Sequence, residues 1–246
     1  MNLFSRTELL IGKSGMEKLK RARVAVFGIG GVGGYAVEAL VRSGIGRLEL
    51  VDNDKISPTN VNRQIIALSD TLGRYKTEAA AERARAINPE CEVTCRNCFF
   101  TSETAGTFDF SDYDYVIDAI DTLAGKIAIV KACREAETPV VSCMGAGNKL
   151  DPTAFEVTDI YKTSVCPLAR AMRKLCRENG IEKLKVVYSK EIPASAADSE
   201  RAAREEGAYK PRVPGSIAFV PSVAGLIAAG EAIKEISGVY GNGIGS

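Results

Sequence analysis

Apolar and polar positions divide the first part of the chain into short β-branched runs and longer segments of helical period. Apolar runs bounded by glycine or charged residues are typical of buried strands. They predict strands at residues 23–27, 47–52, 92–97, 115–118 and 139–143. Apolar residues spaced three and four apart predict helices between them, at residues 32–42, 76–87 and 127–135. Because strands that alternate with helices form βαβ units, we expect an α/β fold, a Rossmann-like, doubly wound and mostly parallel sheet.

The pattern changes after about residue 147, where we expect a C-terminal extension of strands and helices. It is composed of a strand at 154–160, an amphipathic helix at 166–178, a strand at 185–189 and an apolar helix near 223–236. Residues 194–214 are polar and have little periodicity, so we interpret them as a mobile surface loop.

A glycine-rich motif follows the first strand. Gly28, Gly30 and Gly33 form G-x-G-x-x-G, with Gly31 inside the motif. The first glycine permits a tight turn, the second lets the backbone approach phosphate, and the third permits close packing of a helix whose N-terminus favours an anion. Asp52 stands nineteen residues after Gly33, where a carboxylate can accept hydrogen bonds from ribose hydroxyls. The motif predicts a nucleotide site, and alone it leaves NAD or FAD open.

Two cations and a carboxylate expected near the same edge of the sheet favour a triphosphate instead. Arg63, within Thr59–Gln64, and Lys76 can bind phosphate oxygens. Asp121, which follows the strand at 115–118, offers a hard oxygen ligand to Mg²⁺. Hydride transfer needs none of these groups.

The amino-acid composition excludes several kinds of catalytic and metal site. The 246 residues include no histidine, which excludes a catalytic histidine and a histidine-ligated metal, and the formal net charge of +1 indicates no global field for nucleic acid or membranes. Seven cysteines and no signal peptide favour reduced thiols in the cytoplasm. The most apolar stretch, 217–233, is interrupted by proline, glycine and glutamate, so we expect no membrane span.

Together these motifs resemble the adenylating enzymes related to ubiquitin-activating enzyme, the ThiF/MoeB/HesA family. The resemblance is carried by GIGGVGG, LVDND, TNVNRQ, GRYK and DAIDT, which lie between residues 24 and 122. It implies ATP and Mg²⁺ as cofactors. It also implies that Asp52 holds the ribose, that Asn60, Arg63 and Lys76 hold the triphosphate, and that Asp121 binds Mg²⁺ through ATP.

The resemblance further implies a homodimer, in which Arg6 reaches the ATP site of the neighbouring subunit. We expect one adenylating-enzyme domain over residues 1–246, with a nucleotide-binding half at 1–147 and a substrate and dimer half at 148–246. The candidate catalytic residues are Arg6, Arg63, Lys76 and Asp121. The candidate nucleotide-binding residues are Gly28, Gly30, Gly31, Gly33, Asp52, Asp54, Asn60, Arg63, Gln64, Lys76, Asp118 and Asp121.

The cysteines depart from the branch of this family that activates sulfur-carrier proteins. That branch usually holds zinc between two Cys-x-x-Cys pairs in its C-terminal half, whereas this chain has one such pair, Cys95 and Cys98, within an expected strand. Strand positions three apart point to opposite faces, so we expect no structural zinc. Cys166 stands beside Pro167 at an expected helix start. A nucleophilic thiol and a half-buried structural thiol both remain open there.

The second half resembles another branch, the tRNA threonylcarbamoyladenosine dehydratases. The matching segments are FEVTDIYKTS, CPLAR, KVVYS and VPGSIAFVP, between residues 155 and 221. The implied activity is an ATP-dependent cyclisation of N6-threonylcarbamoyladenosine in tRNA through an acyl adenylate. The alternative is an adenylyltransferase that activates the C-terminal glycine of a ubiquitin-like sulfur carrier, and a sulfur-transfer protein partner also stays open. A third reading is an NAD-binding protein or a nucleotide-binding module without catalysis.

A basic stripe on one expected helix favours RNA independently. Arg170, Arg173, Lys174 and Arg177 stand at i, i+3, i+4 and i+7. Such a stripe suits contacts to a phosphate backbone, although solvated basic faces are equally common on helices.

Overall fold

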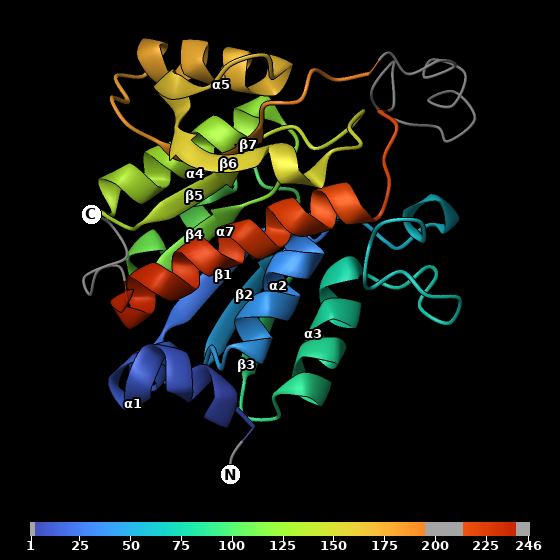
Figure 1. The fold of residues 1–246 in the computed structure, drawn as a ribbon, viewed down its shortest axis with the longest axis vertical. Coiled ribbons are helices and arrows are strands. Elements are labelled where there is room, and N and C mark those ends of the chain that lie inside the picture. Colours follow the sequence, from blue (N-terminus) through green and yellow to red (C-terminus); the bar gives the residue numbers. More distant parts are fainter. Residues whose placement is uncertain (1–2, 195–213, 240–246) are drawn as a thin grey trace.

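The computed structural model describes residues 3–194 and 214–239. Over those residues it contains a seven-stranded sheet in the order β3-β2-β1-β4-β5-β7-β6. All neighbouring strands are parallel except β6 and β7, which pair antiparallel. The expected α/β fold class, with a doubly wound and mostly parallel sheet, is therefore confirmed (Figure 1).

The strands lie close to their predicted positions. They are β1 Arg23–Phe27, β2 Arg47–Val51, β3 Glu92–Arg96, β4 Tyr115–Asp118, β5 Val140–Cys143, β6 Phe155–Asp159 and β7 Lys185–Ser189. The central β1 is buried on both faces after its first residue, which explains why its sequence is a continuous apolar run.

The helices differ more from expectation. They are α1 Ser5–Arg21, α2 Gly33–Arg42, α3 Lys76–Ile87, α4 Leu123–Glu135, α5 Pro167–Glu178 and α7 Phe219–Ser237. The apolar pattern did not predict α1, because only Gly15 and Leu19 are buried on it and Gly12 interrupts it with a φ of 72°. Helices α4 and α7 each begin about one turn earlier than the periodicity indicated. The predicted mobile loop at 194–214 lies outside the described residues except at its two ends.

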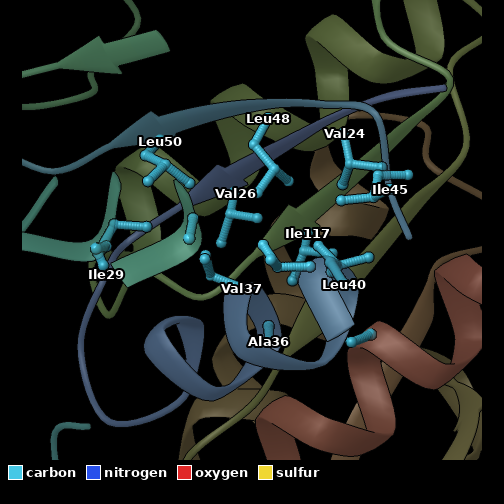
Figure 2. Close-up of a cluster of buried hydrophobic side chains, with 14 of the residues drawn as sticks. Val24, Val26, Ile29, Ala36, Val37, Leu40, Ile45, Leu48, Leu50 and Ile117 are labelled. Atoms are coloured by element: carbon cyan, nitrogen blue, oxygen red, sulfur yellow. The ribbon is translucent and has the colours of Figure 1, made fainter. Parts of the chain in front are cut away.

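Helices cover both faces of the sheet. On one face, α2, α3 and α7 pack over β1, β2 and β4, and α7 crosses beside α2 (Figure 1). Figure 2 shows Val26 and Leu48 of the strands facing Val37 and Leu40 of α2. On the other face, α4 covers an aromatic cluster around Phe27, and α4 and α5 cover β7.

Helix α7 completes the core of the first half although it belongs to the second half of the chain. Its Gly225 lies so close to the start of α2 that a Cβ there would overlap the carbonyl oxygen of Val32. Pro221 lies 3.2 Å from the position of a Cβ on Gly31. The glycine-rich segment is therefore enclosed by a helix from the far end of the described chain.

Candidate functional site

The site lies where the strand order reverses. From β1 the chain builds β2 and β3 on one side and β4, β5, β7 and β6 on the other. The connections that follow β1 and β4 therefore run in opposite directions, which makes the boundary between these two strands a switch point. Ligands of open α/β sheets bind in the crevice outside such a point. Phe27 pairs with Asp118 across the two strands, which places Gly28 and Ala119 together at this edge.

Glycine is required at two positions of the turn. Gly28 has a φ of 87°, and a Cβ there would lie 2.8 Å from the backbone of Ala119. A Cβ on Gly33 would overlap the carbonyl oxygen of Gly28. The turn therefore closes tightly, and α2 starts directly from it with its first N–H groups at the crevice.

Gly30 lies where a ligand could approach, whereas Gly31 is packed against its neighbours. The nearest atom to a Cβ on Gly30 would be Nε2 of Gln64, at 3.9 Å, so the backbone is open on that side. A Cβ on Gly31 would lie 3.4 Å from Cγ of Arg63. The segment that carries Arg63 and Gln64 therefore packs against the glycine turn, as its expected role requires.

Asp52 follows β2 and holds the glycine turn. Its Oδ2 accepts a hydrogen bond of 2.6 Å from the backbone N–H of Ile29, and its Oδ1 accepts one of 2.8 Å from that of Asp54. Burial raises the pKa of Asp52, and the nearby Lys76 ammonium opposes that rise. The carboxylate is thus fixed at the carboxyl edge of the sheet, where the sequence predicts a ribose-binding group.

Lys76 is the first residue of α3 and its side chain is only 7% exposed. Its Nζ lies 2.6 Å from Oδ2 of Asp54, whose own side chain is 58% exposed. A buried ammonium held by a single carboxylate still has further donors. Lys76 is therefore placed to donate to an anionic ligand beside Asp52.

Asn60, Arg63 and Gln64 lie on a short turn that starts with a 3-10 helix at Pro58–Asn60. The carbonyl oxygen of Asn60 accepts from the backbone N–H groups of Arg63 and Gln64 at 3.1 and 2.9 Å. Arg63 Nη1 donates to the carbonyl oxygen of Thr59 at 2.8 Å. Gln64 is buried, and its Oε1 has no hydrogen-bond partner among the described residues. A buried amide oxygen of that kind is suited to a ligand donor.

The two aspartates after β4 have different surroundings. Asp118 is fully buried, and its carboxylate is held by Lys126 of α4 and Ser142 of β5. Asp121 is exposed at the edge of the sheet. Asp121 can therefore reach a ligand directly, whereas contact of Asp118 with a nucleotide stays a prediction. Sequence reasoning missed Lys126 and Ser142, because the register that joins β4, β5 and α4 is not visible in local sequence.

Arg6 lies far from this edge within its own chain. It is exposed in the first turn of α1, and neighbouring Phe4 packs against Gly44, which precedes β2 at the amino edge of the sheet. The structure therefore does not bring Arg6 together with the other candidate residues. Only a second subunit could place Arg6 beside a glycine turn.

The predicted basic stripe lies on α5, and its members differ in exposure. Arg170, Lys174 and Arg177 are exposed, and Arg177 lies over the ring of Tyr161 at 5.5 Å. Arg173 is half-buried and donates to the carbonyl oxygen of Thr163 at 2.9 Å. Three of the four cations are thus available at the surface of the described structure.

No group of three or more histidine, cysteine, aspartate or glutamate side chains that could hold a metal occurs in the described residues. Burial raises the pKa of Cys91 to about 11 and that of Cys143 to about 12, so both thiols are protonated at neutral pH. Cys166 is buried at the start of α5. In residues 3–194 and 214–239, no helix has the length and apolar character needed to cross a membrane.

A glycine turn at the switch point, with a carboxylate and cations around it, defines a nucleotide-binding α/β protein. A family model described as the ThiF family matches residues 4–244. The chain belongs to the ThiF family, and the resemblance drawn from its motifs is confirmed.

Within this family, the chain is similar to tRNA-modifying enzymes over nearly its whole length. It is 46% identical over 243 residues to the tRNA threonylcarbamoyladenosine dehydratase of Bacillus subtilis, covering 96% of this chain and 95% of that protein. The crystal structure of Escherichia coli tRNA N6-threonylcarbamoyladenosine dehydratase in complex with AMP matches with a TM-score of 0.87 at 36% identity, over 98% of this chain and 96% of that one. The same enzyme in complex with ATP matches with a TM-score of 0.85.

Similarity to the sulfur-carrier branch is shorter. The adenylyltransferase and sulfurtransferase MOCS3 of Culex quinquefasciatus is 35% identical over 141 residues. That alignment covers 56% of this chain and 32% of the relative. It spans far less of either protein than the alignment with the dehydratase does.

Proposed function

We propose that this chain is an ATP-dependent dehydratase that cyclises N6-threonylcarbamoyladenosine in tRNA. The observation that carries the proposal is the 46% identity to a curated dehydratase across almost the full length of both proteins. The match to a similar enzyme whose structure is in complex with ATP supports the use of ATP by this fold. As a tRNA-modifying enzyme, the protein would work in the cytoplasm.

ATP is a substrate of this reaction, and the residues at the crevice fit it. The glycine turn leaves the Gly30 backbone open to phosphate, and Gln64 offers a buried amide oxygen without a protein partner in the described structure. In the proposed complex Asp52 binds the ribose, with Asp54 holding Lys76, while Asn60, Arg63 and Lys76 bind the triphosphate. Catalysis would then come mainly from positioning and charge neutralisation.

Mg²⁺ would be held by one protein carboxylate and by the phosphates. Magnesium commonly binds substrate phosphates and only one or two carboxylates, so a site of three protein ligands is not required. Asp121 is exposed beside the glycine turn and suits that single contact. When bound, the ion would neutralise phosphate charge.

The chemistry suits a protein without histidine. The threonyl carboxylate of the modified base is ionised at neutral pH and can attack the α-phosphorus of ATP with loss of pyrophosphate. A nucleophile within the threonylcarbamoyl group then displaces AMP from the acyl adenylate and closes the ring. The base thereby loses one water molecule, whose oxygen leaves on AMP.

The assembly proposed is a homodimer, with Arg6 of each chain at the nucleotide site of its partner. In this dimer Arg6 would be a fourth catalytic residue, beside Arg63, Lys76 and Asp121. The exposed cations of α5 would contact the tRNA backbone without reading its sequence. A sulfur-transfer protein stays open as a further partner.

Mass spectrometry of tRNA nucleosides tests the function directly. The protein is incubated with ATP, Mg²⁺ and tRNA that carries threonylcarbamoyladenosine, and a mass decrease of the modified base by one water molecule is expected. Intact threonylcarbamoyladenosine after incubation contradicts the proposal, provided that pyrophosphate exchange shows the enzyme to be folded and active.

Activation of a sulfur carrier is the second candidate, favoured by the similarity to MOCS3. Pyrophosphate exchange separates the two. Exchange that depends on modified tRNA supports the dehydratase, whereas exchange driven by a small protein ending in Gly-Gly supports the adenylyltransferase.

A further inference from the structure

A fully buried ion pair lies directly beneath the candidate nucleotide site. Lys126 of α4 and Asp118 of β4 have no exposed side-chain surface, and Nζ lies 3.0 Å from Oδ1. Ser142 of β5, which pairs with Asp118 in register, donates from Oγ to Oδ2 of Asp118 at 2.5 Å. Nζ also donates to the carbonyl oxygen of Cys143 at 2.7 Å and to Oγ of Ser142 at 3.3 Å. Each of the three ammonium hydrogens therefore has an acceptor.

Stability alone is a poor reason for such a pair. The loss of hydration on burying two charges offsets much of their attraction, and replacement by apolar side chains of similar volume is often neutral or stabilising. The pair therefore needs an explanation in terms of what it holds in place.

What it holds is the backbone that leads to Asp121. Oδ1 of Asp118 accepts from the backbone N–H of Ile120 at 3.3 Å, so the carboxylate fixes the first peptide groups after β4. The N–H of Ala119 donates to the carbonyl oxygen of Phe27 at 2.8 Å, immediately before Gly28. The same short segment thus forms the floor of the glycine turn and the support of the exposed carboxylate.

We propose that Lys126 is a positioning residue for the nucleotide site. It fixes Asp118, and Asp118 fixes the Ala119–Ile120 backbone so that the Gly28 turn and Asp121 keep their relative position. Lys126 does this without touching the ligand, because its side chain is fully buried. The inference rests on the nucleotide-binding part of the proposed function.

A neutral replacement of the pair tests this in the full-length protein. In Asp118→Asn with Lys126→Met, the amide can still accept from Ile120 and donate to Ser142, and methionine fills the space of the lysine stem. We expect a folded protein in which the dissociation constant for ATP with Mg²⁺ rises roughly ten- to hundredfold, as for other residues that orient a ligand-binding side chain. The gain in ATP affinity on adding Mg²⁺ should also be lost, which a purely structural role would not change.

The control removes another ion pair of the same sheet, in which the carboxylate is fully buried but the Arg23 side chain is 26% exposed. Glu49 of β2 is fully buried and pairs with Arg23 at 2.5 Å, at the amino end of β1. Arg23→Met with Glu49→Gln should alter stability in urea while leaving ATP affinity unchanged. Ser142→Ala gives a second test that keeps both charges, and a smaller loss of Mg²⁺-dependent affinity is expected.

Unchanged affinity and Mg²⁺ dependence in the folded double variant, or in Ser142→Ala if the double variant does not fold, overturns the inference. A wild-type protein that fails to bind ATP overturns both this inference and the proposed function. The tRNA assay stays separate, because ATP affinity is measured without tRNA, so failure of cyclisation alone concerns the substrate.

Discussion

Asp52 combines an observed structural task with the ribose-binding role proposed for it. Its two oxygens accept from Ile29 and Asp54, so the carboxylate ties the glycine turn to the end of β2. Burial raises its pKa even though Lys76 stands nearby. Keeping this carboxylate charged, as the proposed ribose binding requires, therefore opposes folding.

A pH prediction follows for Asp52. When the pKa of a carboxyl group is higher in the folded state than its unfolded value of about 3.9, the group stabilises the fold at pH values below about 3.9. This stabilisation is lost as the pH rises through the folded pKa. Asparagine does not titrate. The free energy of unfolding of wild type relative to Asp52→Asn should therefore fall as pH rises from about 4, by at most about 1.4 kcal/mol per pH unit. Urea denaturation at several pH values measures it, and a difference that grows with pH would contradict the assignment.

The glycine turn and α2 form an element in which neighbouring glycines serve different purposes. Gly33 has no room for a Cβ, because the carbonyl oxygen of Gly28 already occupies that position. Gly30 has room, since only Nε2 of Gln64 comes as close as 3.9 Å. Glycine is thus required by packing at position 33, whereas at position 30 it leaves the backbone open, as the proposed approach of phosphate needs.

Alanine at these two positions should separate folding from binding. Gly30→Ala should leave stability within about 1 kcal/mol of wild type, because no clash arises and Gly30 has no positive φ, while it weakens ATP binding by about tenfold or more. Gly33→Ala should destabilise the protein or prevent folding. Thermal denaturation and calorimetric titration measure the two effects, and normal ATP affinity in Gly30→Ala would show that phosphate does not approach there.

Helix α5 carries the proposed tRNA contact. Arg170→Glu with Lys174→Glu reverses two exposed charges, and tRNA affinity should fall roughly tenfold with a salt dependence shallower by about 0.7–0.9 per lost phosphate contact. The control is Lys13→Glu with Lys20→Glu on exposed positions of α1, which changes the net charge equally. Electrophoretic or fluorescence titration over several salt concentrations measures both. Equal losses in the two variants would mean that only total charge matters.

Sequence predicted most elements because their patterns are local. The strand at 115–118 and the helix at 76–87 were predicted to the residue, since each is an apolar or alanine-rich run with clear ends. Helix α1 was missed because it buries so little. In the site, the glycines and charged residues near Asp52 follow from motif spacing, whereas the support from Lys126 depends on pairing between β4 and β5. Such long-range register has no signature in a single sequence.

Across the whole molecule, the candidate residues form two groups, one at the amino edge of the sheet and one at the carboxyl edge. Helix α1 with Arg6 lies near Gly44 at the amino edge, and the glycine turn lies at the opposite edge. Exposed Leu9 and Leu10 on α1 add apolar surface near Arg6. Arg6 can therefore act at an ATP site only if each subunit contributes its Arg6 to the site of the other subunit.

Mixing of variant subunits tests whether Arg6 acts in the site of the partner subunit. Arg6→Ala and Asp121→Ala should each lose turnover, but their mixture should recover up to about a quarter of wild-type activity, because one site of each mixed dimer regains both residues. A mixture of Arg6→Ala with a chain that carries both changes is the control and should stay inactive. Absence of recovery, with mixed dimers verified by mass spectrometry, would place Arg6 outside the partner's site.

The contact between α7 and the glycine turn has a consequence for how the chain matures on the ribosome. The strands and helices around Gly28 are synthesised first, yet the layer over α2 is completed only when Pro221 and Gly225 arrive. Until then the nascent chain exposes apolar surface, the condition in which emerging proteins aggregate or recruit chaperones. Translation therefore yields a working nucleotide site late, and a product interrupted before α7 would be a target for degradation rather than a smaller enzyme.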